Sequence, residues 1–564
     1  MLGSTHVQRA KVNAREDDEF LAIHGIEEEE NTRPIMVGGE QGGGRGPVSI
    51  VRSTTRVTSG PEVTQKLISA ASAFGQLMEG TYGPQGLDKM LYKSNGETAI
   101  TNDGAKIIAE LLVKHPAAKA FVQLAEAQEQ SCGNGVTTSV LLASSLLKEA
   151  GMLLEKRLHP LIVVEGYQQA LEQCLDWIDA NASQPDATSN TIHSILTTSM
   201  NGTMASTDQE HLTELLLKAF EHIDVQTSPS HAYENIRMAK RRSGAISDTR
   251  CISGLIIDQN LQLDGQPRSL RSGKIACLTC PIEYETTSRD AEIQITSTEQ
   301  YSSFIQAKKD LLAKKTEQIR SSGATMVFCS QNIEPSILHT LSSEGIVMFG
   351  NIEESLLKDI ALTSSSELLD HLDDLSPDSC GHFEHYNIEV TEGAEGRRER
   401  AVITIGEHSN IATIDVGGDG GEASEEVVRN LYDAMRSASV FYQHPTFVYG
   451  GGATFIGAAL HIRQWAERNS TRERLAIEAF ARSLERIPSA LSGNAGKDKL
   501  DTVLELRALH RDGQEKKGVS ADGTLSDMDD VIEPSYTVLH AIELATDTAC
   551  GLLRVDQVIS SRGD

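Results

Sequence analysis

The stretch CGNGVTTSVLLASSLLKEAGML, residues 132–153, joins a glycine-rich turn to a strongly apolar helix. From residue 138 onward apolar residues fall on most sides of the expected helix, which is typical of a helix buried within a helical domain. Glycine lets the backbone approach a ligand closely, and the first N–H groups of a helix favour an anion. A single glycine turn is more often a tight connection between elements, so this turn alone does not identify a site.

Helical periodicity extends over both ends of the chain. Apolar residues at i, i+3 and i+4 spacing predict helices over 63–78, 104–115, 161–180, 471–484 and 500–510. Residues 537–559 are predicted to form a helix followed by a strand. Both ends of the chain are therefore expected to be helical.

The middle of the chain has a different pattern. Short β-like runs are expected at 254–257, 275–278, 324–329 and 345–349, with a charged helix over 298–321 between them. This alternation predicts an α/β module over 253–405. The simplest organisation is one helical domain built from both chain ends, with the middle inserted into it.

Length and charge set wider limits on the protein. A chain of 564 residues predicts about three or four domains. The formal net charge of −29 disfavours a nonspecific nucleic-acid binder and is compatible either with a salt-rich cytoplasm or with an ordinary acidic protein. No apolar run approaches the roughly 18 residues of a membrane span, and the N-terminus does not resemble a secretory signal. Residues 1–33 are expected to form a disordered acidic tail.

Two more glycine turns and two acidic residues are candidates for a site. The turns are TYGPQGLD at 81–88 and YGGGA at 449–453. Asp103 lies in TNDG and Asp433 in NLYDAM; alternatively, Asp103 is only a helix N-cap and Asp433 only part of a solvated helix face. The phosphate loop GxxxxGK[ST] is absent, which argues against an ordinary P-loop nucleotidase.

Other motifs have weaker functional interpretations. Cys277 and Cys280 form a CxxC without a second pair, so two buried strand cysteines are favoured over a redox or metal site. His382 and His385 are capable of binding a metal, but their spacing is not a standard motif and they are expected in a polar loop. A metabolic enzyme is disfavoured because GxSxG, HExxH and GxGxxG after a strand are absent.

Together these motifs resemble the group II chaperonins, which include the archaeal thermosome. The resemblance rests on motifs in matching order from about residue 34 to 559: TYGPQGLDKML, TNDGAKII, HPAAKAFVQLAEAQEQSCGNGVTTS, NLYDAM, YGGGA and ATDTACGLLRVDQVI. With the acidic charge, it suggests a divergent thermosome subunit of a halophilic archaeon.

The resemblance implies a multidomain α/β fold and an ATP-driven double ring that encloses and folds non-native proteins. A helical equatorial ATP-binding domain would comprise 34–190 and 441–564, and a small intermediate domain 191–252 and 406–440. The α/β apical domain, 253–405, would carry a helical protrusion that acts as a built-in lid. The implied partners are non-native proteins and other chaperonin subunits in the cytoplasm, with no nucleic acid and no membrane.

The resemblance also assigns roles to individual residues. Asp103 and Asp433 would be catalytic, and Phe304 and Ile305 are candidates for substrate binding, although they could equally pack into the base of their own helix. ATP and Mg²⁺ are the implied ligands. The nucleotide-binding residues would be Tyr82, Gly83, Pro84, Gly104, Gly133, Asn134, Gly135, Val136, Thr137, Thr138, Gly451, Gly452 and Asn494.

The nucleotide motifs depart from the family pattern. Asn134 stands where the pattern GDGTT has its Mg²⁺-binding Asp, and Val136 replaces its first Thr. A neutral amide is a weaker Mg²⁺ ligand than a carboxylate. The family commonly has Lys, Glu and Lys where this chain has Gln85, Phe455 and Thr203. Two hypotheses follow: an ATP-dependent chaperone whose hydrolysis is slow, or an ATPase-impaired structural or regulatory subunit of a hetero-oligomeric ring.

Overall fold

The computed structural model describes residues 56–59, 61–92, 98–111, 116–185, 188–203, 205, 208–223, 225, 229–241, 243–284, 297–393, 396–406, 410–418 and 421–560. The predicted tail over 1–33 lies outside these residues. The chain forms two compact units, of which the second is Thr64–Val555. In the first unit, strands β1 (Arg56–Ser59) and β20 (Gln557–Ser560) pair antiparallel and so bring together two segments far apart in the sequence.

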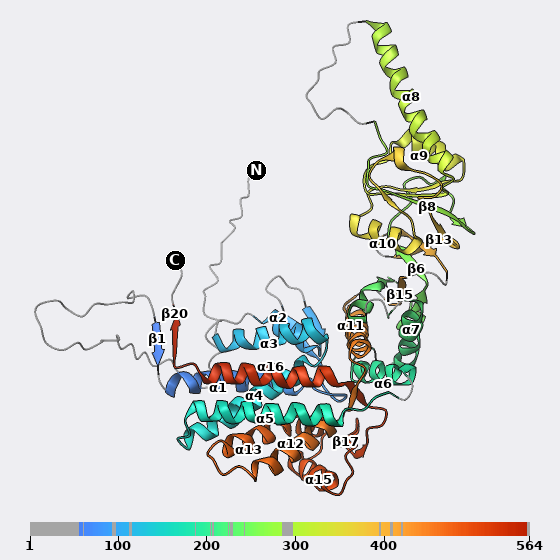
Figure 1. Ribbon diagram of the computed structural model, residues 1–564. Helices are drawn as coiled ribbons and strands as arrows, with labels where there is room; N and C mark the ends of the chain where they lie inside the picture. Colours follow the sequence, from blue (N-terminus) through green and yellow to red (C-terminus); the bar gives the residue numbers. More distant parts are fainter. Residues whose placement is uncertain are drawn as a thin grey trace, which may run out of the picture. The chain divides into compact units, whose positions relative to one another are not determined.

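Helices from both halves of the sequence pack into one block. Figure 1 shows α4, α5 and α16 lying side by side. The helices are α1 (Pro61–Glu79), α2 (Gly104–Glu110), α3 (Pro116–Cys132), α4 (Val136–Glu155), α5 (Pro160–Asn181), α12 (Ala453–Ala466), α13 (Arg474–Leu484), α14 (Arg486–Asn494), α15 (Lys499–Arg511) and α16 (Ser535–Leu553). Helix α4 packs against α3, α13 and α16, and is buried on most sides, as its apolar sequence predicts.

The predicted helices are confirmed, but two are shorter than expected. The helix predicted over 471–484 begins at Arg474. The helix predicted over 104–115 ends at Glu110, because Leu111 adopts an extended backbone. Small antiparallel pairs border the block: β2 (Lys89–Tyr92) with β3 (Thr98–Thr101), β16 (Phe447–Tyr449) with β19 (Ile532–Pro534), and β17 (Lys517–Val519) with β18 (Leu525–Asp527).

A second group of helices packs on a three-stranded sheet. The sheet has the order β4 (Ile236–Lys240), β15 (Ala412–Val416) and β5 (Arg250–Ile252). Its helices are α6 (Thr188–Met200), α7 (Gln209–His222) and α11 (Glu422–Gln443), with 3-10 turns at Pro229–Asn235 and Ile246–Asp248. Helix α11 buries Val427, Leu431 and Ala434 in the core of this group, so its opposite face is free to carry polar residues.

The predicted α/β module is present and is built on a mainly parallel sheet. Its order is β10 (Val347–Phe349), β9 (Met326–Cys329), β8 (Gly273–Leu278) and β11 (Leu368–Leu369), and β12 (Gly381–Phe383) pairs antiparallel with β8. Alternate residues of β9 enter two hydrophobic clusters, Met326 and Phe328 in one and Val327 and Cys329 in the other. The strand is therefore covered on both faces.

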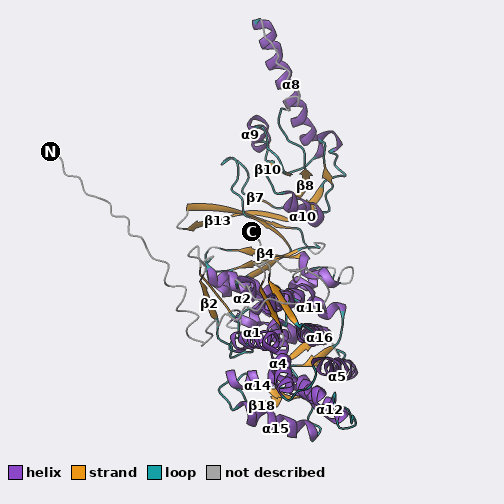
Figure 2. Ribbon diagram, turned by 90° about the vertical axis from the view of Figure 1, so that its left-hand side faces the viewer, coloured by secondary structure: helices purple, strands orange, loops and turns teal. Residues whose placement is uncertain are grey.

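Helices α8 (Thr298–Ser322), α9 (Pro335–Ser343) and α10 (Glu354–Ser364) belong to the same module (Figure 2). Among the residues of α8, only Thr316, Ile319 and Ser322, near its C-terminal end, are buried. A 3-10 turn, Leu372–Asp374, packs against α8. Most of α8 therefore contributes exposed surface and not core.

A four-stranded antiparallel sheet completes the module, and its central hairpin was not predicted. The order is β6 (Gly254–Ile257), β14 (Gly396–Thr404), β13 (His385–Gly393) and β7 (Ser269–Leu270). The expectation that His382 and His385 occupy a polar loop is wrong, because they lie on β12 and β13 with exposed side chains. The segment was expected to be a loop because it is rich in polar residues, but a strand with one face in solvent also carries polar residues on that face.

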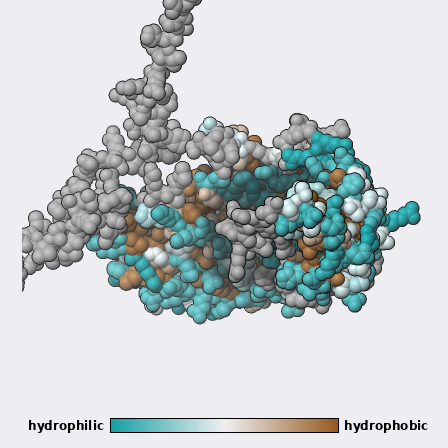
Figure 3. Space-filling view, turned by 90° about the horizontal axis from the view of Figure 1, so that it is seen from above, coloured by the Kyte–Doolittle hydropathy of each residue, from teal (hydrophilic) through white to brown (hydrophobic). Residues whose placement is uncertain are grey.

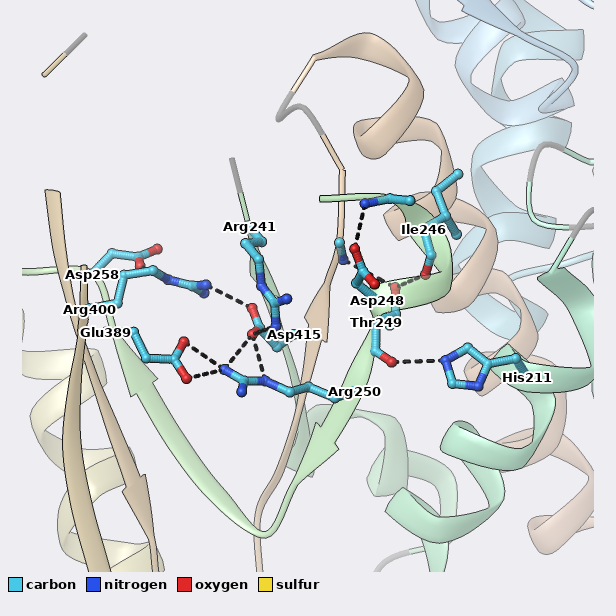
Figure 4. A network of polar contacts seen from close by, with 12 residues as sticks. His211, Arg241, Ile246, Asp248, Thr249, Arg250, Asp258, Glu389, Arg400 and Asp415 are labelled. Carbon is cyan, nitrogen blue, oxygen red and sulfur yellow. Dashed lines mark hydrogen bonds and ion pairs between the residues drawn. The ribbon is translucent and has the colours of Figure 1, made fainter. Parts of the chain in front are cut away.

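A buried carboxylate joins this antiparallel sheet to the three-stranded sheet. Figure 4 shows three arginines around Asp415 of β15, which is fully buried. Arg241 Nη2 donates to Asp415 Oδ2 at 2.6 Å, and Arg250 Nε donates to the same oxygen at 3.1 Å. Arg400 of β14 lies with Nη1 2.9 Å from Asp415 Oδ1.

Burial alone would raise the pKa of Asp415, but the hydrogen bond from Arg241 and the charges of Arg400 and Arg241 outweigh burial and lower it. Arg250 extends the network by donating from Nη2 to both carboxylate oxygens of Glu389, each at 2.7 Å. The two sheets are therefore linked by charged side chains as well as by the backbone connection between them.

Among the residues that Figure 3 colours, most of the surface is hydrophilic, with hydrophobic residues in patches. Among the described helices, none combines the length and apolar character needed to cross a bilayer. The predicted equatorial, intermediate and apical boundaries stay predictions.

Candidate functional site

The turn before α4 has a backbone shape that requires glycine. Gly133 and Gly135 have φ values of +64° and +83°, in the left-handed region that residues other than glycine rarely adopt. Gly135 is the N-cap of α4 and provides no side-chain acceptor, so the first-turn N–H groups of α4 lack a capping side chain. These N–H groups form a cradle for an anion.

A second helix begins in the same way beside the same space. Gly452, with φ +79°, is the N-cap of α12 and also provides no capping side chain. The first glycine turn is tied to α4 because Thr138 Oγ1 donates to Tyr82 Oη at 3.1 Å. The three glycine turns, which lie far apart in the sequence, thus border a single cavity of about 270 Å³.

Most of the residues that the sequence assigns to a nucleotide line this cavity. They are Tyr82, Gly83, Pro84, Asp103, Gly104, Gly133, Asn134, Gly135, Val136, Thr137, Thr138, Asp433, Gly451 and Gly452. Asn494 does not line it. Its Nδ2 donates to the backbone oxygens of Glu79 and Tyr82, at 2.7 and 2.8 Å, so Asn494 holds the first glycine turn in place.

The side chain of Asn134 is largely occupied by protein contacts. Its Oδ1 accepts a hydrogen bond from Gly135 N at 2.6 Å. Its Nδ2 donates to Ser437 Oγ at 3.1 Å and more weakly to Ser199 Oγ at 3.5 Å. The amide therefore ties the glycine turn to α11 and α6, and leaves only one carbonyl lone pair for a ligand.

The two predicted catalytic carboxylates have different surroundings. Asp103 is the N-cap of α2, where its Oδ1 accepts from Ala105 N at 2.9 Å, and it also lines the cavity. Asp433 does not occupy a solvated helix face. Burial, followed by the negative charges of Asp103 and Glu129, raises the pKa of Asp433 well above its usual range.

Two further carboxyl groups in the cavity were not identified from the sequence. Glu129 lies in the last turn of α3, where burial raises the pKa of its carboxyl although Arg436 Nη1 donates to Oε1 at 2.7 Å. Glu533 lies on β19, where burial raises its pKa to about 7. Helical spacing before the glycine turn could have indicated Glu129, but no sequence pattern marks Glu533.

The described residues that line this cavity include four carboxyl groups and no Lys, Arg or His. Arg429 and Arg436 line an adjoining cavity, of about 820 Å³, that shares Asp103, Glu129 and Asp433 with the first. Within the described part of the chain, no three His, Cys, Asp or Glu side chains could hold a metal ion by themselves. Mg²⁺ in proteins is commonly held by one or two carboxylates together with substrate phosphates. The residues fit Mg²⁺ bound together with a phosphate ligand.

The remaining departures from the family pattern lie at different distances from the cavity. Thr203 lines it, but its hydroxyl donates to Met200 O at 2.7 Å. Gln85 is exposed and Phe455 is buried in the core, and neither lines the cavity. The departures from the family pattern that would affect a bound ligand directly are therefore those at Asn134, Val136 and Thr203, which line the cavity.

The other candidates lie in the α/β module. Cys277 is buried on β8, where burial raises its pKa to about 12, and Cys280 follows the strand half-buried. The prediction of two buried strand cysteines thus holds for Cys277 only. On α8, Ile305 is 36% exposed, whereas Phe304 is half-buried against Tyr284, with ring centroids 6.2 Å apart.

Comparison with known proteins assigns this chain to a family. A model of the TCP-1/cpn60 chaperonin family matches residues 74–562. The chain therefore belongs to this family, and it is a group II chaperonin.

Its relatives include archaeal thermosome subunits. The chain is 33% identical to the thermosome subunit alpha of Archaeoglobus fulgidus over 523 residues, 92% of this chain and 95% of that protein. It is 33% identical to a thermosome subunit of Methanopyrus kandleri over 510 residues, 89% and 93% of the two chains. It is 32% identical to the thermosome subunit alpha of Thermoplasma acidophilum over 529 residues, 92% and 95% of the two chains.

Proposed function

We propose that this chain is a subunit of a cytoplasmic double-ring chaperonin that binds Mg-ATP, hydrolyses it slowly and uses the cycle to enclose and fold non-native proteins. Residues 34–190 with 441–564 would provide most of the nucleotide site, with Asn430 and Asp433 of α11 completing it, and residues 253–405 would bind the client protein. The observation that carries the slow cycle is the described lining of the cavity, in which a neutral Asn134 accompanies four carboxyl groups and no cationic side chain.

Nucleotide binding would rest chiefly on the backbone. The first-turn N–H groups of α4 and α12, which no side chain caps, are donors for the phosphate oxygens. Bound Mg²⁺ would neutralise phosphate charge, with Asp103 or Asp433 as its carboxylate ligand beside the weaker Asn134. Asp433 would otherwise orient the attacking water, because it lines the cavity.

Slow hydrolysis follows from what the lining lacks. Phosphoryl transfer depends mainly on positioning and on neutralising charge at the transferred phosphate. Removing one charged or hydrogen-bonding group aimed at the transition state costs roughly 10²- to 10³-fold in rate. The Asn134 amide and the Val136 side chain remove one anion and one hydroxyl from the positions where the family pattern has them.

The alternative is an ATPase-impaired structural or regulatory subunit of a hetero-oligomeric ring. The observation that favours it is the use of Asn134 Nδ2 as a donor to Ser437, because this contact gives the residue a structural role. The chaperonin relatives are named as subunits, which supports assembly of this chain in either case.

Imaging and ATP-dependent refolding of the purified chain test the proposal together. The expected result is a double ring by negative-stain microscopy that raises the yield of a chemically denatured protein when Mg-ATP is added. A monomer that does so only after an active partner subunit is added supports the alternative. A chain that neither assembles nor binds non-native protein under either condition rejects both.

A further inference from the structure

One face of α11 carries four polar residues toward the nucleotide cavity and the elements beside it. They occur at 426, 430, 433 and 437, a spacing that puts them along one side of the helix. The two outer residues are bound to protein. Glu426 Oε1 accepts from Thr101 Oγ1 at 2.8 Å, and Ser437 Oγ accepts from Asn134 Nδ2 at 3.1 Å.

The two inner residues, Asn430 and Asp433, both line the nucleotide cavity. Asn430 is only 2% exposed, and its Nδ2 has no hydrogen-bond partner among the described residues. A buried amide left without an acceptor is destabilising, so a partner supplied by a ligand is favoured. An N–H donor needs an acceptor, and phosphate oxygens are acceptors only.

We propose that Asn430 Nδ2 donates a hydrogen bond to the terminal phosphate of bound ATP. The contact provides a neutral donor in a cavity whose described lining has four carboxyl groups and no Lys, Arg or His. The inference rests on the proposed function, since it requires ATP in this cavity.

The terminal phosphate is favoured over the rest of the nucleotide because of the position of Asp433. Residues three apart on a helix are neighbours, with Cβ atoms about 5–6 Å apart. A carboxylate that orients the attacking water must lie close to the phosphate that is hydrolysed. The amide of Asn430, one turn earlier on the same face, is therefore within reach of the same phosphate.

Nucleotide affinity separates this role from a purely structural one. Asn430→Leu keeps the branching and the number of heavy atoms of the side chain and removes the donor, while Asn430→Asp keeps its shape and replaces the donor by a charge. Ser439→Ala is the matched control, because Ser439 is buried on the same helix, donates to Met435 O and does not line the cavity. Dissociation constants of Mg-ATP and Mg-ADP are measured by calorimetry for each full-length protein, with melting temperatures as the check on folding.

The expected result is that Asn430→Leu weakens ATP binding about tenfold to a hundredfold, the range for one hydrogen bond to a charged group, and leaves ADP binding within twofold. Asn430→Asp should weaken ATP binding further, and Ser439→Ala should change neither constant. Equal weakening of ATP and ADP, or no change in either, would overturn the inference. A wild-type chain that binds neither nucleotide would overturn the proposed function as well, and this result is distinct because it appears without any substitution.

Discussion

Asn134→Asp is the substitution that most directly probes the proposed metal position. It replaces one cavity-lining amide by a carboxylate of the same shape. Gly135 N, 2.6 Å from Oδ1, can donate to the carboxylate as it does to the amide. The hydroxyls of Ser437 and Ser199, which now accept from Nδ2, can rotate and donate instead. The substitution should therefore preserve the turn.

The substitution is expected to raise the affinity for Mg²⁺ and the rate of hydrolysis through its added charge, because the shape of the side chain stays the same. A carboxylate adds a full negative charge where Mg²⁺ would bind, and the described lining offers no cation to compete for it. One such group is worth about 2.7–4 kcal/mol in the transition state, or roughly 10²- to 10³-fold in rate. Without metal, the fifth carboxyl group should lower stability because it adds repulsion to Asp103, Glu129 and Asp433.

The assay measures metal binding and hydrolysis separately. Mn²⁺ bound in the presence of a nonhydrolysable ATP analogue, followed by electron paramagnetic resonance, should bind more tightly to Asn134→Asp, and phosphate release should be faster. Asn201→Asp is the control. It adds the same charge elsewhere in the lining, where Oδ1 can still accept from Gln209. Metal binding and phosphate release that increase equally in both variants, or that do not increase in Asn134→Asp, would refute the proposal that Asn134 occupies a metal position.

Three further predictions concern other groups. The pKa of Glu533 is raised from 4.5 to about 7, so its contribution to folding stability is fully present below pH 4.5 and is lost as pH rises through 7. Wild-type stability should therefore fall by about 3 kcal/mol more than that of Glu533→Gln between these pH values. A difference in melting temperature between the two proteins that stays constant from pH 5 to 8 would contradict this. Asp415→Ala should destabilise the chain by about 3–5 kcal/mol because Arg400, only 5% exposed, loses a partner; an unchanged unfolding midpoint would count against this. Ile305→Ser should weaken capture of a denatured protein without changing the melting temperature, whereas Phe304→Ser should lower stability; the opposite pattern would reverse their assignments.

Elements whose burial is strongly patterned could be predicted from the sequence. Helix α4 was predictable because nearly every side of it is apolar, and β9 because it is a short continuous apolar run covered on both faces. The hairpin β13–β14 was missed because its polar residues, such as Arg398 and Glu399, resemble those of a loop. Periodicity reports burial, and on β13 the buried Tyr386 and Ile388 alternate with polar residues, which is the pattern of a strand with one solvated face.

The site was predictable where the chemistry lies in a local motif. The glycine turns at Gly133 and Gly452 and the carboxylate of Asp433 carry such motifs. Glu533 lies in no such motif. Asn430 is the first residue of NLYDAM, but the motif does not mark its amide, and the importance of both residues comes from their place beside a cavity formed by distant segments. The inference of a saline cytoplasm from the net charge stays a prediction.

The central claim is that the site binds ATP but hydrolyses it slowly. The most direct test is single-turnover hydrolysis with substoichiometric Mg-ATP. Bound nucleotide is separated from free nucleotide and analysed for ADP over time. Wild-type chain should retain intact ATP far beyond the one second or less of a typical enzyme turnover, and Asp433→Ala should retain it longer still. Conversion of bound ATP within about a second, slowed by Asp433→Ala, would contradict the account, as would a failure to bind ATP at all.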